Sequence, residues 1–253
     1  MLRFRHAGEC SGSSGALRDV GRKLLRAMIT SSANPRLKLI RRLESRRQRA
    51  KLGLFACEGE DLVDAAVAAG IEPVDLLVAG EDVAPELLGS VSTLAHPPRV
   101  VGVFRRADLP SWVAGSAVLA LWHVTDPGNV GTLIRTADAF GASVALSEGC
   151  ADPTGPKALR GSAGAIFRVP LGCYGQAGEG WRVALTAHEG EPLDRVELAE
   201  RTVFVLGAER EGLPDDVTAS CDVAASIPLA AGAESLNVAV AGAIALYEWR
   251  RRL

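Results

Sequence analysis

The stretch AVLALWHVTDPGNVGTLIRTADAFGASVALS, residues 117–147, carries the pattern from which the fold class follows. An apolar run over residues 117–125 is followed by a helical pattern over residues 129–141 that ends at a glycine, and then by a second apolar run, residues 142–147. Short apolar runs bounded by turn residues are typical of buried strands, and a helix between two of them favours parallel pairing. This segment therefore predicts a β-α-β unit.

The same alternation continues towards the end of the chain. The sequence predicts a helix over PKALRGSAGAIF (156–167), strands over WRVALTAH (181–188), TVFVLG (202–207) and ASIPL (225–229), and a long helix from Ser235. Strands and helices in this order favour an α/β domain with a mainly parallel sheet and helices on both faces. We place this domain at residues 111–253.

A smaller α/β unit is predicted for residues 31–110, after a flexible tail of residues 1–30. A basic amphipathic helix begins at Asn34-Pro35 and carries an apolar seam among eight Lys and Arg residues. The elements that follow are a strand over LFACEG (54–59), a helix over 60–70, a strand over 73–80, a helix over 85–91 and a closing strand within 99–110. Pro110-Ser111 is the expected boundary.

Positive charge is concentrated at the beginning of the chain. Residues 1–51 hold 14 of the 28 Lys and Arg residues and three acidic residues, although the whole chain has a net charge of -2. A basic block ahead of an acidic body favours contact with a polyanion such as RNA, because cations near phosphates release counterions. The alternative is an ordinary solvated helix face.

The sequence argues against a membrane or secreted protein. No apolar run reaches the roughly 18 residues that a membrane helix needs, and the first residues lack the apolar core of a secretory signal. We therefore expect a cytoplasmic protein. The five cysteines are widely spaced, which fits neither a disulfide framework nor a zinc site, so we interpret them as reduced and mostly small core residues: Cys10, Cys57, Cys150, Cys173 and Cys221.

Glycine-containing loops follow three of the predicted strands, where parallel sheets bind ligands. In the first loop, Asp126-Pro127-Gly128-Asn129 precedes a helix whose single basic residue is Arg135. A guanidinium in this position suits an anion or a ribose oxygen. A structural ion pair with Asp138 or Glu148 is the alternative.

The second and third loops also combine glycine or serine with hydrogen-bonding side chains. Gly207 ends a strand and is followed at once by Glu209, so the turning backbone could contact an adenine edge; a solvated loop acid is the alternative. In the third loop Ser235 is a natural helix cap. Asn237 would lie one turn inside an apolar helix, buried beside Ala241, where its amide needs a partner that could be a ligand.

At these loops the sequence resembles the SpoU/TrmH family of the SPOUT methyltransferase superfamily. The segments that carry the resemblance are HVTDPGNVGTLIRTADAFGA (123–142), VFVLGAEREGLP (203–214) and ASIPLAAGAESLNVAVAGAIALYEW (225–249). They are similar to the three motifs of that family, in the same order. The segment SSANPRLKLIRRLESRRQRAKLGLFACEG (31–59) resembles the substrate-binding domain of an rRNA-directed branch.

The resemblance implies a methyltransferase that uses S-adenosylmethionine, without a metal, to methylate a ribose 2′-hydroxyl of structured RNA. It also implies a trefoil-knotted domain and a homodimer with rRNA as the favoured partner. The catalytic residues it implies are Asn129, Arg135, Glu209, Ser235 and Asn237. The residues it implies for the methyl donor are Gly207, Ile227 and Leu236. Arg210 departs from the family pattern, which more often has a small residue after the glutamate.

Methyl transfer to a hydroxyl requires alignment of the two reactants and removal of a proton. A guanidinium is a poor base, so we expect Arg135 to stabilise the developing alkoxide or a nearby phosphate. Ser235 and Asn237 would orient the ribose, and Glu209 would hold Arg135 or Asn129. One alternative is the same reaction on tRNA, and another is a non-catalytic ribosome assembly factor. A third is a nucleotide-dependent enzyme with a doubly wound fold, but this sequence lacks the glycine-rich motif that follows the first strand of such enzymes.

Overall fold

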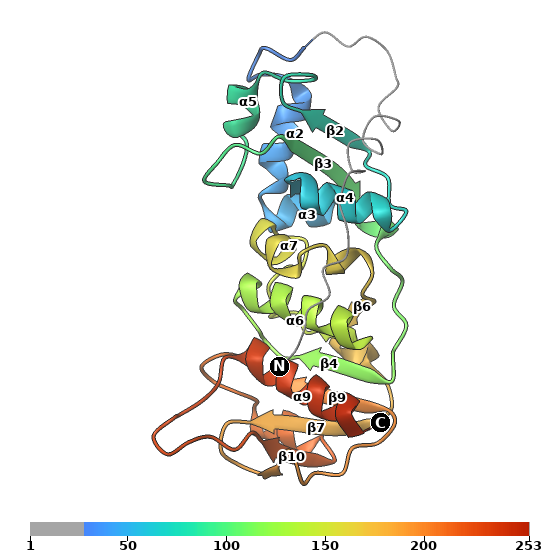
Figure 1. Ribbon diagram of the computed structural model, residues 1–253, viewed down its shortest axis with the longest axis vertical. Helices are drawn as coiled ribbons and strands as arrows, with labels where there is room; N and C mark the ends of the chain where they lie inside the picture. Colours follow the sequence, from blue (N-terminus) through green and yellow to red (C-terminus); the bar gives the residue numbers. More distant parts are fainter. Residues whose placement is uncertain (1–27, 253) are drawn as a thin grey trace, which may run out of the picture.

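The computed structural model describes residues 28–252, which form a small and a large unit stacked end to end (Figure 1). Apart from its last three residues, the tail predicted for residues 1–30 lies outside this range. Among those three, Ile29 is buried and pairs with Val83. The end of the predicted tail therefore belongs to the small unit rather than to a flexible segment.

The small unit is built on an antiparallel sheet with the strand order β1-β3-β2. Its elements are α2 (Pro35–Leu43), α3 (Arg46–Leu52), β1 (Leu54–Glu58), α4 (Glu60–Ala68), β2 (Asp75–Val78), α5 (Pro85–Gly89), β3 (Val100–Arg105) and the 3-10 turn η1 (Arg106–Asp108). One face of the sheet packs Leu77, Val101 and Val103 against α2 and α5. The other packs Phe55 and Phe104 against α4 and the large unit.

The basic segment forms two helices instead of the single helix that we predicted. Its apolar seam is buried as expected at Leu37, Ile40 and Leu43, but α2 ends there and α3 begins at Arg46. The side chain of the buried Arg49 donates to the backbone carbonyls of Leu43 and Glu44 at 2.8 Å. These carbonyls would otherwise lack partners at the end of α2, so Arg49 stabilises the break.

The large unit contains a seven-stranded sheet whose strands are all parallel, in the order β6-β5-β4-β9-β7-β10-β8. Its elements are β4 (Ala117–Leu121), α6 (Pro127–Phe140), β5 (Ser143–Leu146), α7 (Pro156–Ser162), η2 (Ala165–Phe167), β6 (Leu171–Cys173), η3 (Tyr174–Ala177), β7 (Trp181–Thr186), β8 (Glu191–Pro192), β9 (Thr202–Leu206), α8 (Asp215–Ala219), β10 (Val223–Ser226) and α9 (Val238–Arg252). The predicted parallel α/β architecture is confirmed.

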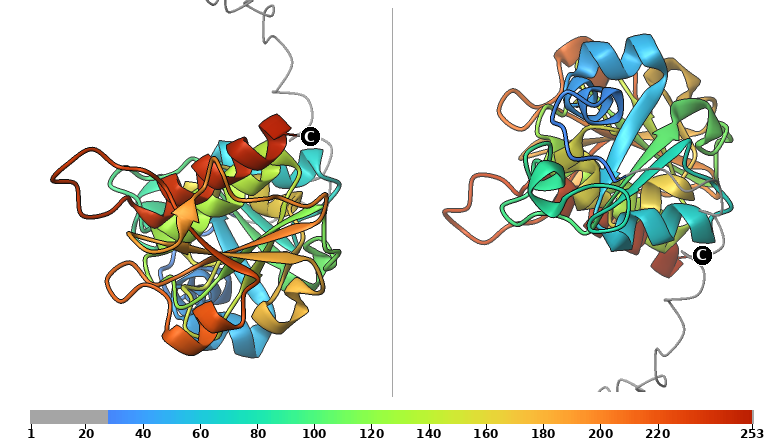
Figure 2. Two further views of the ribbon diagram at one scale, coloured as in Figure 1. Left: turned by 90° about the horizontal axis from the view of Figure 1, so that it is seen from below. Right: turned by 90° about the horizontal axis from the view of Figure 1, so that it is seen from above.

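Side chains alternate between the two faces of the large sheet. Leu119 and Leu121 pack towards α6 and α9, whereas Val118 and Ala120 pack on the opposite face, which α8 partly covers. Helices α6 and α9 lie side by side, as the view from below shows (Figure 2, left). A Cβ on Gly242 would lie 2.5 Å from the side chain of Leu133, so glycine is what permits this close approach.

Two predicted helices have different bounds in the structure. The helix expected over residues 156–167 is interrupted at Ala163 and Gly164, which have φ angles of 47° and 82°. A Cβ on Gly164 would lie 2.4 Å from that of Ala65, so the interruption brings the backbone close to α4. The last helix begins at Val238 rather than Ser235.

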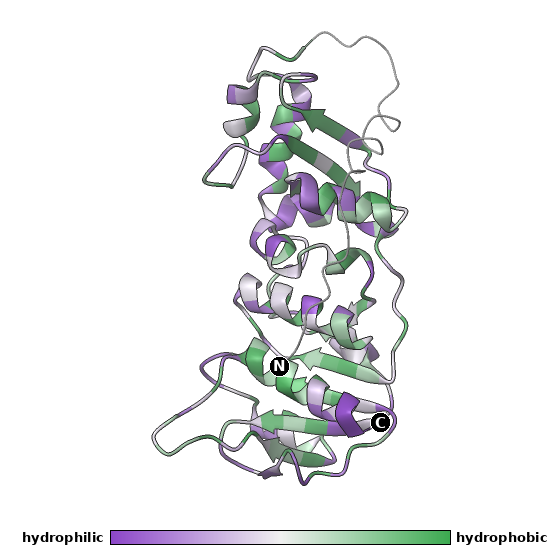
Figure 3. Cartoon of the chain, viewed as in Figure 1, coloured by the Kyte–Doolittle hydropathy of each residue, from purple (hydrophilic) through white to green (hydrophobic). Residues whose placement is uncertain are grey.

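The two units share a continuous apolar core and a buried ion pair. Phe167 packs against Phe55 and Phe104, with ring centroids 6.3 and 5.7 Å apart. Beside them, Arg49 Nη2 lies 2.8 Å from Asp152 Oδ2, and both side chains are about 5% exposed. Figure 3 shows the apolar strands of both sheets and the hydrophilic residues gathered on α2 and α3.

The structure bears on the predicted state of the cysteines and on the expectation that no helix spans a membrane. Four cysteines lie within residues 28–252 and are free; Cys57 and Cys150 are buried, whereas Cys173 and Cys221 are at least partly exposed. Cys10 lies outside the described residues. The prediction of core cysteines therefore holds for two of these four. Across residues 28–252, every helix is too short or too polar to cross a bilayer.

Candidate active site

The three loops singled out from the sequence meet at one edge of the large sheet. In β4 and β9 Leu121 pairs with Leu206, so these neighbouring strands end at the same level. The loop after β4 leads into α6, the loop after β9 contains Glu209, and α9 begins beside them. Parallel pairing thus brings together residues 80 or more positions apart in the chain, such as Asn129 and Glu209.

The first loop is fixed by Asp126, which caps α6. Asp126 Oδ1 accepts hydrogen bonds from the backbone N–H groups of Gly128 at 2.6 Å and Asn129 at 3.2 Å, and Pro127 occupies the first helical position. Lys157 Nζ donates to Asp126 Oδ2 at 2.9 Å. This bond from Lys157, helped by those from Gly128 and Asn129, lowers the pKa of Asp126 against the opposing effect of burial. The result is a fixed position for the side chain of Asn129.

The second loop folds back on itself directly after β9. The backbone groups of Ala208 and Gly212 exchange two hydrogen bonds of 3.0 Å, which places Glu209 at the tip of a tight turn. A Cβ on Gly207 would lie 2.2 Å from the carbonyl carbon of Gly212, so only glycine fits without displacing the turn. Arg210, which departs from the family pattern, is exposed, and the turn between Ala208 and Gly212 forms around it.

Glu209 is an anchored carboxylate. Its oxygens accept hydrogen bonds from the backbone N–H groups of Thr125 at 3.2 Å and Asp126 at 3.0 Å, and from Asn129 Nδ2 at 3.0 Å. Burial alone would raise the pKa of Glu209, but these donors outweigh it and hold the pKa below its ordinary value. Of the two partners expected for Glu209, the structure therefore contains Asn129.

The third loop contributes Asn237, in a role that differs from our expectation. Asn237 is exposed and caps α9, with Oδ1 accepting from the N–H groups of Ala239 at 2.9 Å and Val240 at 3.3 Å. The prediction of a buried amide inside the helix is wrong, as is the prediction that Ser235 caps it. Asn237 Nδ2 donates to Asn129 Oδ1 at 2.9 Å.

The remaining predicted residues lie on the same elements without joining this network. Arg135 and Ser235 are exposed, and among the described residues neither forms an ion pair or a side-chain hydrogen bond. The alternative ion pair of Arg135 with Asp138 is absent, since Asp138 pairs with Arg168 at 2.6 Å. Gly207 is buried, Ile227 is half-buried after β10, and Leu236 is 38% exposed.

Sequence reasoning missed Lys157 and the two backbone donors of Thr125 and Asp126. Lys157 lies on α7, 31 residues beyond its partner Asp126, and no spacing rule connects the two. An aspartate immediately before Pro-Gly at a helix start was a recognisable capping signal. The structure also has no group of three or more His, Cys, Asp or Glu side chains arranged for a metal within residues 28–252.

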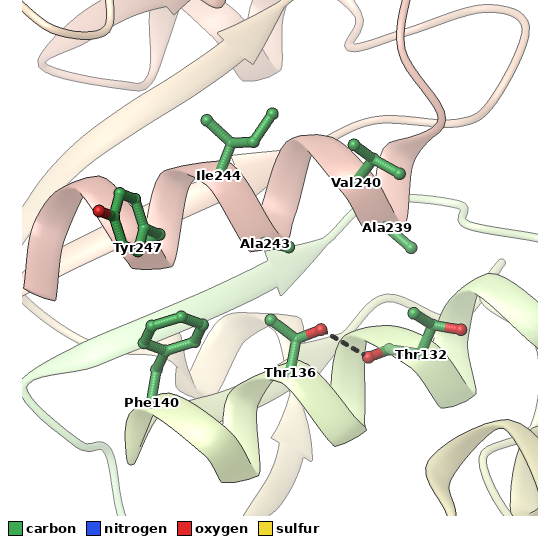
Figure 4. Close-up of a pocket in the computed structure, with 8 residues that line it drawn as sticks. All are labelled: Thr132, Thr136, Phe140, Ala239, Val240, Ala243, Ile244 and Tyr247. Carbon is green, nitrogen blue, oxygen red and sulfur yellow. Dashed lines mark hydrogen bonds between the residues drawn. The ribbon is translucent and has the colours of Figure 1, made fainter. Parts of the chain in front are cut away.

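An apolar groove runs between α6 and α9, adjoining the site. Figure 4 shows its lining, with Thr132, Thr136 and Phe140 from α6 and Ala239, Val240, Ala243, Ile244 and Tyr247 from α9. The two threonine hydroxyls donate to backbone carbonyls one turn earlier, so they are satisfied within α6. Val240 is 46% and Tyr247 is 58% exposed, so two large apolar side chains two turns apart on the same face of α9 are open to solvent.

Two family models match the chain and together cover most of it. The SpoU rRNA Methylase family matches residues 116–247, and the MRM3-like substrate binding domain matches residues 34–105. These ranges coincide with the large parallel sheet and the small antiparallel sheet, respectively.

Relatives and solved structures agree with this match. A 23S rRNA (guanosine(2553)-2′-O)-methyltransferase from Bacillus subtilis is 31% identical over 88% of this chain and 98% of its own length. The crystal structure of an AdoMet-bound rRNA methyltransferase from Sinorhizobium meliloti superposes with a TM-score of 0.81 at 29% identity, covering 90% of this chain and 98% of its own. The SpoU methyltransferase AviRb from Streptomyces viridochromogenes, in complex with AdoMet, gives a TM-score of 0.75 at 27% identity, over 87% and 98% of the two chains.

Proposed function

The chain belongs to the SpoU rRNA methylase family, and from that premise we propose that it methylates a ribose 2′-hydroxyl of rRNA with S-adenosylmethionine as the donor. The observation that carries this proposal is the network of side-chain hydrogen bonds that links Glu209 to Asn129 and Asn129 to Asn237. This network joins all three family motifs at the carboxyl edge of the sheet.

This network has one consistent direction. An ionised carboxylate only accepts hydrogen bonds, so Glu209 requires the NH₂ group of Asn129 to face it. Asn129 Oδ1 then faces Asn237, whose NH₂ group donates to it while its own oxygen caps α9. Both amides are thereby held with their remaining N–H groups available. Such preorganised donors suit the orientation of a ribose and the stabilisation of developing negative charge on its oxygen.

The loops beyond β9 and β10 fit the methyl donor. Within the segment 227–236, one backbone hydrogen bond is formed, between Ala233 and Ala230, so most of its backbone groups are free to bind a ligand. Gly207, Ile227 and Leu236 would hold S-adenosylmethionine through such groups and apolar contact. When bound, the donor supplies an electrophilic methyl group. We assign Arg135 to the developing alkoxide or an adjacent phosphate, and Ser235 with Asn237 to the ribose.

Residues 31–110 serve as the RNA-binding domain in this proposal, and residues 111–253 as the methyltransferase domain. The exposed cations of α2 and α3 support RNA binding: they include Lys38, Arg42, Arg47 and Lys51. Other cations of the basic segment are committed to the protein, because Arg36 pairs with Asp75 and Arg49 with Asp152. A cytoplasmic location is part of the same proposal.

We further propose that the chain forms a homodimer through the α6–α9 groove. The groove is apolar and its rim exposes Val240 and Tyr247, which a second copy would bury. Tyr247→Arg is expected to yield a monomer in analytical ultracentrifugation. Val113→Arg, which changes an apolar side chain that is 65% exposed elsewhere, is the matched control. An unchanged sedimentation coefficient for Tyr247→Arg would refute this interface.

A trefoil knot in the methyltransferase domain is part of the same proposal. Its support is the family membership and the position of β9 between β4 and β7, strands that precede it by many residues. Tracing the polypeptide through a crystal structure, from β9 through the segment 227–237 to α9, would test it.

The decisive experiment is methyl transfer itself. The purified protein is incubated with labelled S-adenosylmethionine and either rRNA or tRNA from cells that lack the gene, and the product is mapped for ribose methylation. One methylated rRNA position is expected. Label in tRNA instead would support the alternative substrate, and donor binding without transfer would support a ribosome assembly factor.

A further inference from the structure

His123 is a strained, exposed residue that the network described above does not use. Its φ angle is 53°, which is rare for a residue with a side chain. Such a conformation costs free energy and persists only where the surrounding structure enforces it. It lies between the end of β4 and Thr125, whose N–H group binds Glu209. The strained position therefore lies two residues from the proposed catalytic network.

The surroundings hold the imidazole ring firmly. The ring stacks on Trp122 with an interplanar angle of 2° and a centroid distance of 4.9 Å. A Cβ on Gly149 would lie 2.5 to 3.0 Å from three ring atoms, so the backbone of Gly149 packs closely against the ring. The backbone N–H of His123 donates to Ser147 Oγ at 2.9 Å. Despite this packing His123 is exposed, and its ring nitrogens form no hydrogen bond within residues 28–252.

The loop between β5 and α7, which packs against His123 through Gly149, is also attached to the basic helix α3. Arg46 donates to the backbone carbonyls of Cys150 at 3.1 Å and Glu148 at 3.5 Å. Arg47 and Lys51, four residues apart on α3, are exposed. His123 therefore lies beside the loop that α3 contacts, and two residues before Thr125, whose backbone N–H binds Glu209.

We infer that the imidazole of His123 binds the sugar-phosphate backbone of the substrate RNA next to the methylated nucleotide. This inference rests on the proposed function. A fixed ring with unpaired nitrogens at its edge suits phosphate or ribose oxygens, and contacts of this kind position RNA without reading its sequence. RNA bound by α3 would reach the methyl donor past this residue.

Two substitutions separate the nitrogens of the ring from its packing. His123→Phe keeps an aromatic ring against Trp122 and removes the nitrogens, whereas His123→Gly removes the ring and accepts the positive φ without strain. His188→Phe, at an exposed histidine between β7 and β8 and outside the proposed RNA-binding domain, is the matched control. The KM for rRNA from cells lacking the gene and its dissociation constant are measured, with S-adenosylmethionine affinity and thermal unfolding as checks on the fold.

Both His123 variants are expected to raise the KM and the dissociation constant for RNA about ten-fold, the effect of one lost charge-assisted hydrogen bond, without altering kcat or donor affinity. His188→Phe is expected to match the wild type. Wild-type RNA affinity in His123→Phe with weakened binding in His123→Gly would mean that the ring only packs, and would overturn the inference. The RNA affinities test it even if the wild type transfers no methyl group, a result that would overturn the proposed function instead.

Discussion

Asn237 donates a hydrogen bond of 2.9 Å to Asn129, although the two residues are 108 positions apart in the chain. Asn237 caps α9, and Asn129 lies in the first turn of α6. Because Asn129 also donates to Glu209, a change at one of these positions reorients the amides at the others. The network is therefore expected to respond to substitution as a unit.

Asn129→Asp is expected to abolish this order. The new carboxylate would face that of Glu209, and mutual repulsion would displace one of them. We expect kcat to fall by about 10² to 10³, as for the loss of an oriented donor. Methyl transfer to rRNA at saturating donor measures it. Asn34→Asp is the control, because aspartate caps α2 as well as asparagine does and introduces the same charge. Equal kcat values for the two variants would exclude the proposed role.

Arg135→Ala is expected to abolish turnover while leaving donor affinity nearly intact. The guanidinium is exposed, and in the described part of the chain no acidic side chain pairs with it, so its removal should leave the fold unchanged. Arg168→Ala removes a guanidinium that is paired with Asp138 and serves as the control. Calorimetry with S-adenosylmethionine decides the assignment: donor affinity lost in parallel with activity would show that Arg135 binds the donor instead.

The sequence predicted β4, β5, β7 and β9 well because these strands are largely apolar, but it missed the short strands β6 and β8 and placed β10 at residues 225–229 instead of Val223–Ser226. In β4 and β9 every residue is buried, and such runs are recognisable in isolation. The break between α2 and α3 was not predictable in this way. It depends on Arg49, whose partners Leu43, Glu44 and Asp152 include one that lies 103 residues away.

The site was predicted as a set of loops but not as a geometry. The motifs indicated Asn129, Glu209 and Asn237, which the structure joins by hydrogen bonds. Helix periodicity misplaced Asn237, because the helical pattern of the sequence begins at Ser235, three residues before the helix itself begins at Val238. Pattern cannot distinguish a capping asparagine from one in the first turn when both precede an apolar run.

Gly207→Ala is expected to weaken donor binding. The added methyl group would overlap the backbone of Gly212 and Leu213, so the turn that presents Glu209 would have to open. Gly175→Ala is a matched control, because its Cβ would have no neighbour within 4 Å. We expect at least a ten-fold loss of S-adenosylmethionine affinity for Gly207→Ala, or about 1.4 kcal/mol, and none for Gly175→Ala. Unchanged affinity in both would remove Gly207 from the donor site.

Asp152→Asn is expected to destabilise the protein by about 3–5 kcal/mol, because it leaves the buried charge of Arg49 unpaired. Asp138→Asn, in the more exposed pair with Arg168, should cost about 1 kcal/mol or less. Urea denaturation measures both. Similar costs for the two variants would contradict the burial argument.

The destabilisation by Asp152→Asn should also depend on pH. Burial raises the pKa of Asp152, but hydrogen bonds from Thr154 and the charges of Arg49 and Arg106 outweigh it and hold the pKa below 3.8. A lowered pKa in the folded state stabilises the protein above pH 3.8, and this stabilisation disappears as the pH falls through the folded-state value. The difference between wild type and variant should therefore be constant from neutral pH down to mildly acidic pH and shrink only below pH 3.8.

Replacing Arg47 and Lys51 together by alanine should weaken RNA binding in a salt-dependent manner. Each cation that neutralises a phosphate contributes about 0.7 to 0.9 to the slope of log K against log salt, so the slope should decrease by about 1.5. Arg195→Ala with Arg201→Ala removes the same charge from the segment between β8 and β9, outside the small unit. Filter binding of rRNA at several salt concentrations compares the two. An equal decrease in slope for both pairs would mean that RNA affinity depends only on the net charge of the protein. A decrease confined to the replacement of Arg47 and Lys51 would show that these residues contact phosphates.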